Sequence, residues 1–270
     1  MFYDKLNNRL IYLRSTATEE FWDQHWQNQK IDPPDLPPYL QALRGHFFGR
    51  DFVLRTTKQY LALGQSVVDG GCGLGQYVKR LSQAGYEAYG VDFAPHTIAQ
   101  VTQHYPELDV RVGDVRALPF SDCFFDGYWS LGVIEHFWNG YSEIASEIHR
   151  VLKPGGYLFV TFPTMSKLRH IKRILRRYPT WSPTEEPPGF YQFALDPIQV
   201  EDAFHNLGFS LIERSGIDGS KGIRDEVLAS TYFAKALRSS SICSRGLNWA
   251  LDMATRRWAG HLALLVLRKT

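Results

Sequence analysis

The spacing of apolar residues along the chain changes near residue 65. Before that point they recur at helical intervals, first after residue 18 and again over 52–63, where Gly64 provides a C-terminal cap. The proline-rich stretch 33–38 separates the two as a stiff connector. We therefore expect residues 1–64 to form an N-terminal helical cap or lid. The ring-bearing side chains of its first helix are Phe21, Trp22, His25 and Trp26.

From residue 65 onward, short β-branched or aromatic runs alternate with amphipathic stretches. This alternation predicts a doubly wound, Rossmann-like α/β domain over 65–270, with a mainly parallel sheet covered by helices on both faces. The expected strands cover 66–69, 86–91, 109–112, 125–130, 157–162, 209–213 and 261–268. The expected helices cover 75–84, 95–104, 141–152 and 197–207.

Two segments do not follow the alternation. Residues 164–189 are rich first in basic residues and then in proline, and residues 216–258 contain two or three helical patterns. Both follow sheet strands, so we interpret them as helical insertions on the domain rather than as separate domains.

Composition and charge narrow the possible environments. Apolar residues make up 44% and charged residues 21%, with a net charge of +2, so neither nucleic acid nor an anionic membrane is demanded as a partner. The three cysteines are far apart and form no metal-binding cluster, which indicates a reducing compartment and no metal site. No signal peptide is visible, and the apolar run 262–267 is too short to span a bilayer. We therefore expect a cytoplasmic protein.

A glycine-rich turn follows the first strand of the domain. Asp69 ends the strand, and Gly71, Gly73 and Gly75 alternate before helical periodicity begins. This D-x-G-x-G-x-G spacing matches neither a dinucleotide fingerprint nor a phosphate-binding P-loop. Asp69 places negative charge beside the turn, which suits a cationic ligand such as an ammonium or a sulfonium better than a pyrophosphate. The alternative is a tight strand-to-helix turn without a ligand.

Carboxylates also end the next two strands. Asp92 closes the second strand at the distance where nucleotide sites place a ribose-binding carboxylate, although it could simply cap the helix that begins at Pro95. Asp114 follows the third strand and could accept a hydrogen bond from an exocyclic amine, or be an ordinary loop residue.

Taken in order, these motifs resemble those of class I S-adenosylmethionine-dependent methyltransferases, and most closely the small-molecule branch typified by ubiquinone- and menaquinone-biosynthesis enzymes. The resemblance covers roughly residues 60–215 and implies S-adenosylmethionine as cofactor. It also implies a seven-stranded sheet whose last strand, 261–268, runs antiparallel. The segments that carry it are 67–75, 91–92, 113–120, 125–130, 135–136 and 152–157.

The resemblance assigns roles to individual positions. It implies that Asp69 and Gly71 hold the methionine part of the cofactor, with Gly73 and Gly75 of the same turn as further cofactor-binding residues. Asp92 would bind the ribose hydroxyls, with Phe93 beside it in the same site. Asp114 would bind the adenine amino group and Val115 would supply backbone contacts. Ser130 and Leu131 would lie beside the methionine moiety.

The acceptor of the methyl group is less well defined. His136 follows the fourth strand and is the best candidate for a general base if the acceptor is a hydroxyl; the alternative is a structural or pocket-lining role. Glu135 suits the electrostatics of a helix start. Tyr77 could contact the methionine end of the cofactor. The N-terminal rings around Trp22 could form a lid over the cofactor or simply pack on the sheet.

The segment 167–178 is basic and contains no acid. Leu168, Ile171, Leu175 and Tyr178 would fall on one helical face, a pattern that suits either a peripheral membrane contact or a solvated helix with one face on the core. Our hypothesis is methyl transfer to a small or lipid-linked acceptor, with oxygen slightly favoured and no nucleic-acid partner. The alternatives are a protein or nucleic-acid methyltransferase and a non-catalytic binding module; the oligomeric state is open.

Overall fold

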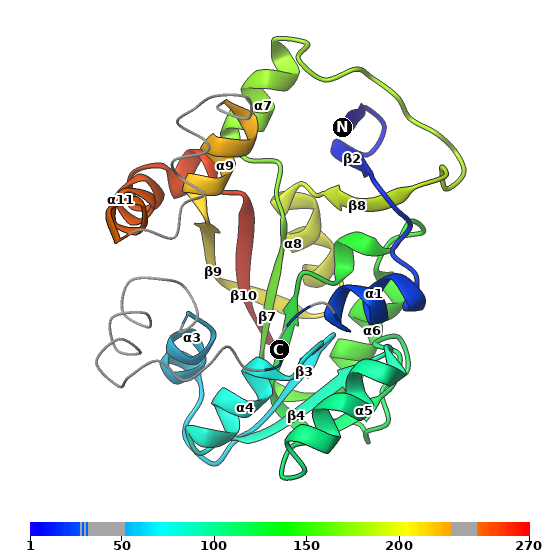
Figure 1. Ribbon diagram of the computed structural model, residues 1–270, viewed down its shortest axis with the longest axis vertical. Helices are drawn as coiled ribbons and strands as arrows, with labels where there is room; N and C mark the ends of the chain where they lie inside the picture. Colours follow the sequence, from blue (N-terminus) through cyan, green and yellow to red (C-terminus); the bar gives the residue numbers. More distant parts are fainter. Residues whose placement is uncertain (28, 30, 32–51, 228–241) are drawn as a thin grey trace.

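The structure, a computed structural model, describes residues 1–27, 29, 31, 52–227 and 242–270 (Figure 1). Its centre is a seven-stranded sheet in the order β5-β4-β3-β6-β7-β10-β9. Neighbouring strands from β5 to β7 pair in parallel, and β10 pairs antiparallel with both β7 and β9. The predicted antiparallel last strand is therefore confirmed. The strands are β3 (Ser66–Gly70), β4 (Glu87–Asp92), β5 (Asp109–Val112), β6 (Phe125–Leu131), β7 (Leu152–Pro163), β9 (Phe209–Ile217) and β10 (Leu262–Lys269).

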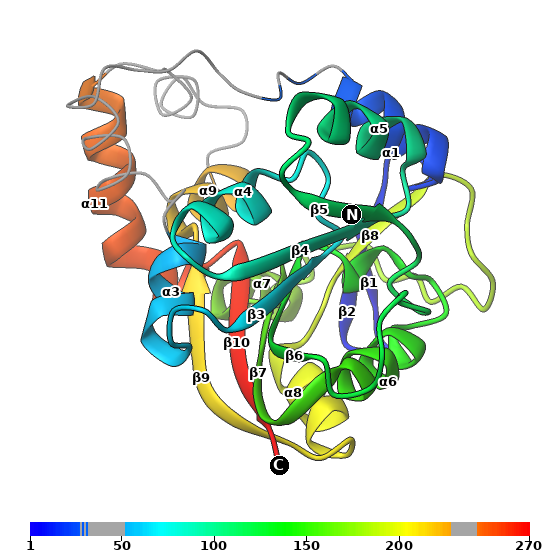
Figure 2. The ribbon, with the colours of Figure 1, turned by 90° about the horizontal axis from the view of Figure 1, so that it is seen from below.

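Helices cover both faces of this sheet (Figure 2). One face carries α3 (Phe52–Tyr60), α4 (Gln76–Gln83) and α5 (Pro95–His104), and the other carries α6 (Ser142–Val151) and α8 (Pro197–His205). The doubly wound arrangement is confirmed. Within the described ranges, every helix falls short of the length or the apolar character that a bilayer crossing needs.

Side chains of the central strands alternate between two cores. Tyr128 belongs to the core that packs under α6 and α8, whereas its neighbour Trp129 packs with Val53 of α3 and Leu81 of α4. In β7, Phe159 faces the same side as Trp129, and their rings stack 4.5 Å apart. Successive strand residues point to opposite faces, so an unbroken apolar run can fill both cores at once.

A second sheet was not anticipated by the sequence pattern. β1 (Phe2–Asp4), β2 (Arg9–Leu13) and β8 (Phe190–Ala194) form three antiparallel strands, in the order β1-β2-β8. The guanidinium of Arg9 lies 3.6 Å from the ring centroid of Phe193 and pairs with Asp4 at 3.0 Å. These contacts fix the start of the chain to the segment that precedes α8.

The remaining described elements are helical. α1 (Glu19–Gln27) is the predicted N-terminal helix and packs against α5. The two insertions contribute α7 (Lys167–Ile174), α9 (Gly219–Glu226) and α11 (Ile242–Ala259), with the short 3-10 helix η1 (Ile134–His136) following β6. The predicted connector 33–38 lies outside the described residues.

The apolar face predicted for segment 167–178 is present only in part, and its exposure disagrees with the alternative of a face packed on the core. Ile171 and Leu175 are 51% and 62% exposed, whereas Arg169 is buried and Tyr178 is buried beside it. The helix ends at Ile174, and Arg176 adopts a left-handed conformation (φ 51°), so the chain turns back before Tyr178. Tyr178 therefore does not continue the face that starts at Ile171.

Candidate active site

A cavity of about 770 Å³ lies at the carboxyl edge of the sheet, where the first four parallel strands end. We refer to it as the first cavity; its volume is within the range of small-molecule sites. Open α/β sheets bind ligands at this edge because loops and helix N-termini converge there. Eight predicted site residues line it: Asp69, Gly71, Asp92, Phe93, Asp114, Val115, Leu131 and His136.

Asp69 is the most perturbed acid of the first cavity. Its side chain is buried, and its Oδ1 atom has no hydrogen-bond partner among the described residues. Burial, together with the charge of Asp92, raises the pKa of Asp69 to about 7. A buried carboxylate without a partner is costly, so this site favours a ligand that brings positive charge or hydrogen-bond donors.

The glycine turn is held by β4 and covered by α1. The backbone N–H of Gly71 donates to the carbonyl oxygen of Val91 at 2.7 Å. Gly71 and Gly73 have φ of 87° and 50°, in the left-handed region that favours glycine. A Cβ atom at Gly73 would lie 2.7 Å from the indole of Trp26. Gly73 therefore allows α1 to approach the turn closely and does not itself line the first cavity.

Asp92 connects the turn to the next helix. Its Oδ2 accepts a hydrogen bond from the Gly73 N–H at 2.8 Å, and its Oδ1 accepts from the Ala94 N–H at 3.0 Å. Burial raises the pKa of Asp92. Asp92 thus orders the loop at the start of α5 and still lines the first cavity, so the two roles considered for it from the sequence are compatible.

Asp114 also lines the first cavity and is less buried than Asp69 and Asp92. Its carboxylate pairs with the guanidinium of Arg116 at 2.6 Å, and that contact lowers its pKa. Both side chains are partly exposed. A carboxylate held ionised and oriented in this way can accept a hydrogen bond from an amine.

Three predicted residues lie outside the lining. Gly73 is under Trp26, and Gly75 caps α4 with a left-handed φ of 66°. Ser130 is buried, and its hydroxyl has no partner among the described residues. The three belong to the frame of the site and do not face the first cavity.

Aromatic side chains of α1 close one side of the first cavity. Trp22 and Trp26 both line it, and the rings of Trp22 and His136 lie nearly perpendicular to each other with their centroids 5.1 Å apart. Tyr191 of β8 lies at the same distance from His136. The N-terminal helix, the loop after β6 and the second sheet therefore meet at His136.

His136 is held as a neutral imidazole. Its Nδ1 lies 2.7 Å from the carbonyl oxygen of Tyr191, which can only accept a hydrogen bond, so Nδ1 carries the proton and Nε2 holds a lone pair. Burial lowers the pKa of His136 to about 4. Its neighbour Glu135 is buried with its Oε2 unpartnered among the described residues, and burial raises the pKa of Glu135 to about 8.

Several lining residues were not anticipated. Gln76 and Glu143 lie in the first turns of α4 and α6, whereas the others come from connecting segments, with Glu186 in the proline-rich part of the first insertion. Tyr77, considered for the methionine end, does line the first cavity. Lining residues not identified from the sequence include Gln76, Arg116, Trp138, Asn139, Glu143 and Glu186.

A second cavity, of about 1590 Å³, continues along the same edge of the sheet, where β7 and β9 end and β10 begins. Phe52 and Leu262 line both cavities, so the two adjoin. The second cavity has an apolar part that includes Met165, Trp249 and Met253.

Comparison with known proteins agrees with this architecture. Residues 68–160 match the methyltransferase domain family. The chain is 27% identical over 186 residues to a probable S-adenosylmethionine-dependent methyltransferase of Mycolicibacterium smegmatis, covering 68% of this chain and 67% of that one. It is 32% identical over 155 residues to a probable phthiotriol/phenolphthiotriol dimycocerosates methyltransferase 2 of Mycobacterium ulcerans, covering 54% and 58%. The match thus spans only about three fifths to two thirds of these relatives.

The chain carries a class I S-adenosylmethionine-dependent methyltransferase domain. This is an enzyme domain, and its cofactor is S-adenosylmethionine. The fold has a counterpart in the geranyl diphosphate C-methyltransferase of Streptomyces coelicolor A3(2), crystallised with S-adenosyl-L-homocysteine. That likeness has a TM-score of 0.57 at 14% identity and covers 95% of this chain and all of the other. The family resemblance read from the sequence motifs is confirmed.

The residues that line the first cavity fit this cofactor. Two buried carboxylates, Asp69 and Asp92, face the first cavity with no basic side chain bonded to either among the described residues. A ligand with an ammonium and a sulfonium would supply the missing positive charge. The aromatic faces of Trp22 and Trp26 provide further favourable contacts for a cation.

Proposed function

We propose that the chain transfers a methyl group from S-adenosylmethionine to a small or lipid-linked acceptor that bears an anionic group and a hydroxyl. The unpartnered, buried carboxylate of Asp69 beside Asp92 carries the cofactor part of this proposal. The bound cofactor supplies an activated methyl group, and the protein supplies orientation, exclusion of water and proton transfer.

In this proposal Asp69 and Gly71 hold the methionine part of the cofactor and Asp92 and Phe93 the ribose. Asp114 and Val115 bind the adenine, and Leu131 lies beside the methionine part. The frame residues Gly73, Gly75 and Ser130 position these groups from outside the lining. The proximity of Trp26 to Gly73 gives α1 the role of a lid.

The second cavity supports an anionic acceptor. Each of its four acids accepts a hydrogen bond within the fold. Asp218 accepts from the Lys221 N–H at 3.3 Å and Asp252 from the Gly219 N–H at 2.6 Å. Asp196 accepts from the Ile198 N–H at 2.9 Å and Glu213 from the Tyr60 hydroxyl at 2.8 Å. The side chains of Arg55, Arg256 and Arg257 have no acidic partner among the described residues. This excess of positive charge beside an apolar wall suits an amphiphile with a negative group.

His136 supports oxygen as the methylated atom. Its neutral imidazole with Nε2 unprotonated can accept the proton that a hydroxyl must lose. A pKa of about 4 makes it a weak base, so an acidic hydroxyl, such as that of an enol or a phenol, suits it better than an alcohol.

The cofactor assignment is tested by calorimetry with S-adenosylmethionine and S-adenosylhomocysteine. Wild-type protein should bind both, and Asp92→Ala should weaken binding by about tenfold or more. Asp122→Ala removes an exposed carboxylate outside the first cavity and serves as the matched control. Failure of the wild-type chain to bind either compound contradicts the proposed function.

The acceptor class is tested with dodecyl phosphate, an anionic amphiphile, below its critical micelle concentration and at saturating S-adenosylhomocysteine. We expect binding that is lost in the Arg256→Ala/Arg257→Ala double variant, and no comparable binding of uncharged dodecyl maltoside. Lys58→Ala, an exposed cation of α3 outside both cavities, is the control. If dodecyl phosphate and dodecyl maltoside bind equally well, the proposal that the acceptor bears an anionic group is wrong.

A lipid-linked acceptor requires the protein to reach a membrane surface, and 167–178 is the segment we propose for that contact. The compartment that we propose is the cytoplasm, at the inner face of the membrane. The exposed free thiol of Cys123 suits a reducing environment of this kind.

A further inference from the structure

The polarity of α7 is inverted relative to an ordinary surface helix. Its basic residues Arg169 and Lys172 point into the protein, while Ile171, Ile174 and Leu175 are 51%, 69% and 62% exposed. The three aliphatic positions are spaced by three and four residues, so they form one continuous strip. We call this strip the α7 ridge. Single exposed apolar side chains are common, but a strip on one helical face is not.

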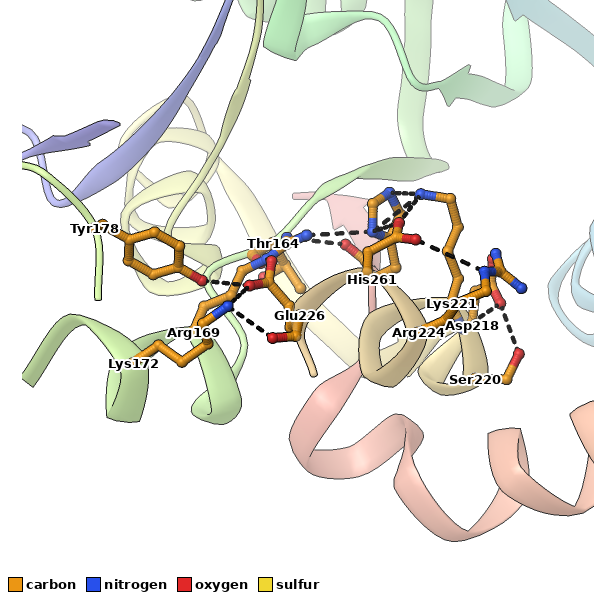
Figure 3. A network of polar contacts seen from close by, with 11 residues as sticks. Thr164, Arg169, Lys172, Tyr178, Asp218, Ser220, Lys221, Arg224, Glu226 and His261 are labelled. Atoms are coloured by element: carbon orange, nitrogen blue, oxygen red, sulfur yellow. Dashed lines mark hydrogen bonds and ion pairs between the residues drawn. The ribbon is translucent and has the colours of Figure 1, made fainter. Parts of the chain in front are cut away.

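Buried polar contacts hold α7 in this orientation (Figure 3). The Arg169 guanidinium donates to Glu226 of α9 at 2.8 Å and to the carbonyl oxygen of Thr164 at 2.7 Å. Lys172 and the hydroxyl of Tyr178 both donate to the other oxygen of Glu226, at 2.5 and 2.6 Å. Rotating the α7 ridge inward would break this buried network. The network therefore keeps the ridge exposed.

The surroundings of the α7 ridge are basic. Lys167, Arg176 and Arg177 are exposed and form no ion pair with any described residue, and no acid occurs between Ser166 and Thr184. Beyond the helix, Trp181 is 37% exposed. Aliphatic side chains surrounded by Lys and Arg, with a Trp nearby, are the composition of a helix that lies in a membrane interface.

The N-terminal hairpin lies at the same end of the molecule (Figure 1). The Trp181 N–H donates to the carbonyl oxygen of Tyr3 at 3.0 Å, and the Lys5 N–H donates to the hydroxyl of Ser182 at 3.1 Å. The turn beyond Lys5 presents Leu6, which is 80% exposed. Lys5 and Leu6 thus place a basic and an apolar residue at the same end of the molecule as the α7 ridge.

We propose that the α7 ridge docks on the surface of an anionic lipid bilayer. A helix of this length extends only about 12 Å, which is too little for a stable interface between two copies, since each partner typically buries about 800 Å². A bilayer needs no matching protein surface, and the uncompensated charges of Lys167, Arg176 and Arg177 are complementary to its anionic head groups.

This docking deepens the proposed function and rests on it in one respect, the lipid-linked nature of the acceptor. Lys167 and His170 of α7 line the second cavity, as do Thr164 and Met165 just before the helix. Docking through α7 would therefore bring the second cavity close to the membrane surface. An acceptor with a long apolar chain could then pass to the enzyme with little exposure to water.

The test is co-sedimentation with vesicles of phosphatidylcholine containing 30% phosphatidylglycerol (about one anionic lipid in three), a content chosen to give a negative surface. Wild-type protein should bind these vesicles, and binding should weaken as salt is raised. The Ile171→Ser/Ile174→Ser/Leu175→Ser variant should lose about tenfold or more in partitioning. Arg176→Gln/Arg177→Gln should lose a similar factor with anionic vesicles only.

Ile212→Ser, which changes an exposed isoleucine of β9, is the matched control and should bind vesicles like the wild type. S-adenosylhomocysteine affinity should remain unchanged in all variants, which separates failure of docking from failure of the proposed function. Vesicle binding that survives the triple substitution overturns the proposal. So does a wild-type dimer in light scattering that the same substitution converts to monomer, because a second copy would then be the occupant.

Discussion

The carboxylate of Asp23 in α1 accepts hydrogen bonds from both the backbone N–H and the hydroxyl of Thr97 in α5, at 3.0 and 2.9 Å. Ala94, the residue that caps α5, provides no side-chain hydrogen bond. Asp23 therefore satisfies a free N–H in the first turn of α5 from another helix. The contact also fastens the helix that carries Trp22 and Trp26 over the first cavity.

Asp23→Ala should loosen α1 and weaken cofactor binding. The buried N–H and hydroxyl of Thr97 would lose their acceptor, at a cost of about 1–3 kcal/mol. Amide hydrogen exchange in α1 should accelerate, and affinity for S-adenosylhomocysteine should fall. Asp23→Asn, which keeps an acceptor oxygen, should restore most of both, and Glu19→Ala in the exposed first turn should change neither. Unchanged exchange in Asp23→Ala would exclude the fastening role.

Gly73→Ala tests the approach of α1 to the glycine turn. A Cβ atom would meet the Trp26 indole at 2.7 Å, and φ is 50°. Gly85→Ala is the matched control, because φ there is 95° but nothing lies within 4 Å of an added Cβ. Both variants should lose about 1 kcal/mol of stability from backbone strain. Only Gly73→Ala should also weaken S-adenosylhomocysteine binding and shift the tryptophan fluorescence. If the two variants bound S-adenosylhomocysteine with equal affinity, Trp26 would not cover the cofactor.

Local patterns were sufficient to predict the main sheet and its helices. The alternation of strands and helices predicted α5 over 95–104 and β5 over 109–112 with the observed ends. Three glycines after a strand ending in Asp69 predicted a ligand-binding turn. Each of these signals lies within a few consecutive residues, which is why sequence reasoning could find them.

Long-range pairings could not be predicted in this way. β2 and β8 are five residues each and pair across a large separation, with Tyr12 opposite Gln192. The polarity of α7 depends on Glu226, which lies 57 residues after the arginine it pairs with. Helical periodicity separates apolar from charged faces. It does not show that the charged face will be buried because its basic residues pair with a distant acid. The same holds for Tyr191, whose carbonyl oxygen sets the tautomer of His136.

Cofactor binding should release a proton through Asp69. With a pKa of about 7, Asp69 holds a proton in the free protein at pH 6, whereas a cationic ligand favours its ionised form. Apparent affinity should therefore rise with pH up to about 7. Calorimetry at pH 6 in buffers of different ionisation enthalpy should show release of about one proton, and little at pH 8. Asp69→Asn should bind more weakly and release none; release that persists in this variant would assign the proton to another group.

Glu226→Gln should destabilise the fold strongly. Arg169 and Glu226 are both 1% exposed in their side chains, and Lys172 and Tyr178 share the same carboxylate. Removing the charge leaves a buried guanidinium uncompensated, at a cost of about 3–5 kcal/mol. Asp225→Asn breaks the partly exposed pair with Lys221 and should cost about 1 kcal/mol or less. Thermal unfolding compares the two, and similar losses would mean that burial does not strengthen the Glu226 contacts.

His136→Gln separates a proton-transfer role from a lining role. If His136 removes the proton of an acidic hydroxyl, the variant should lose about 10²–10⁴-fold in methyl transfer while its affinity for S-adenosylhomocysteine changes little. A lining role predicts a change in acceptor KM with kcat nearly preserved. Stability provides an independent check, because the folded pKa of about 4 lies below the ordinary value of 6.5.

The unfolded chain takes up a proton at His136 as pH falls below about 6.5, and the folded protein takes it up only near 4. Wild-type stability should therefore fall across this window by about 3 kcal/mol from this group alone. His136→Gln should lack that part of the pH dependence, so the difference between the two unfolding free energies should change with pH. If the unfolding free energies of the wild type and His136→Gln ran parallel from pH 7 to 4, His136 would not be held neutral by burial. The weak-base mechanism would then lose its support.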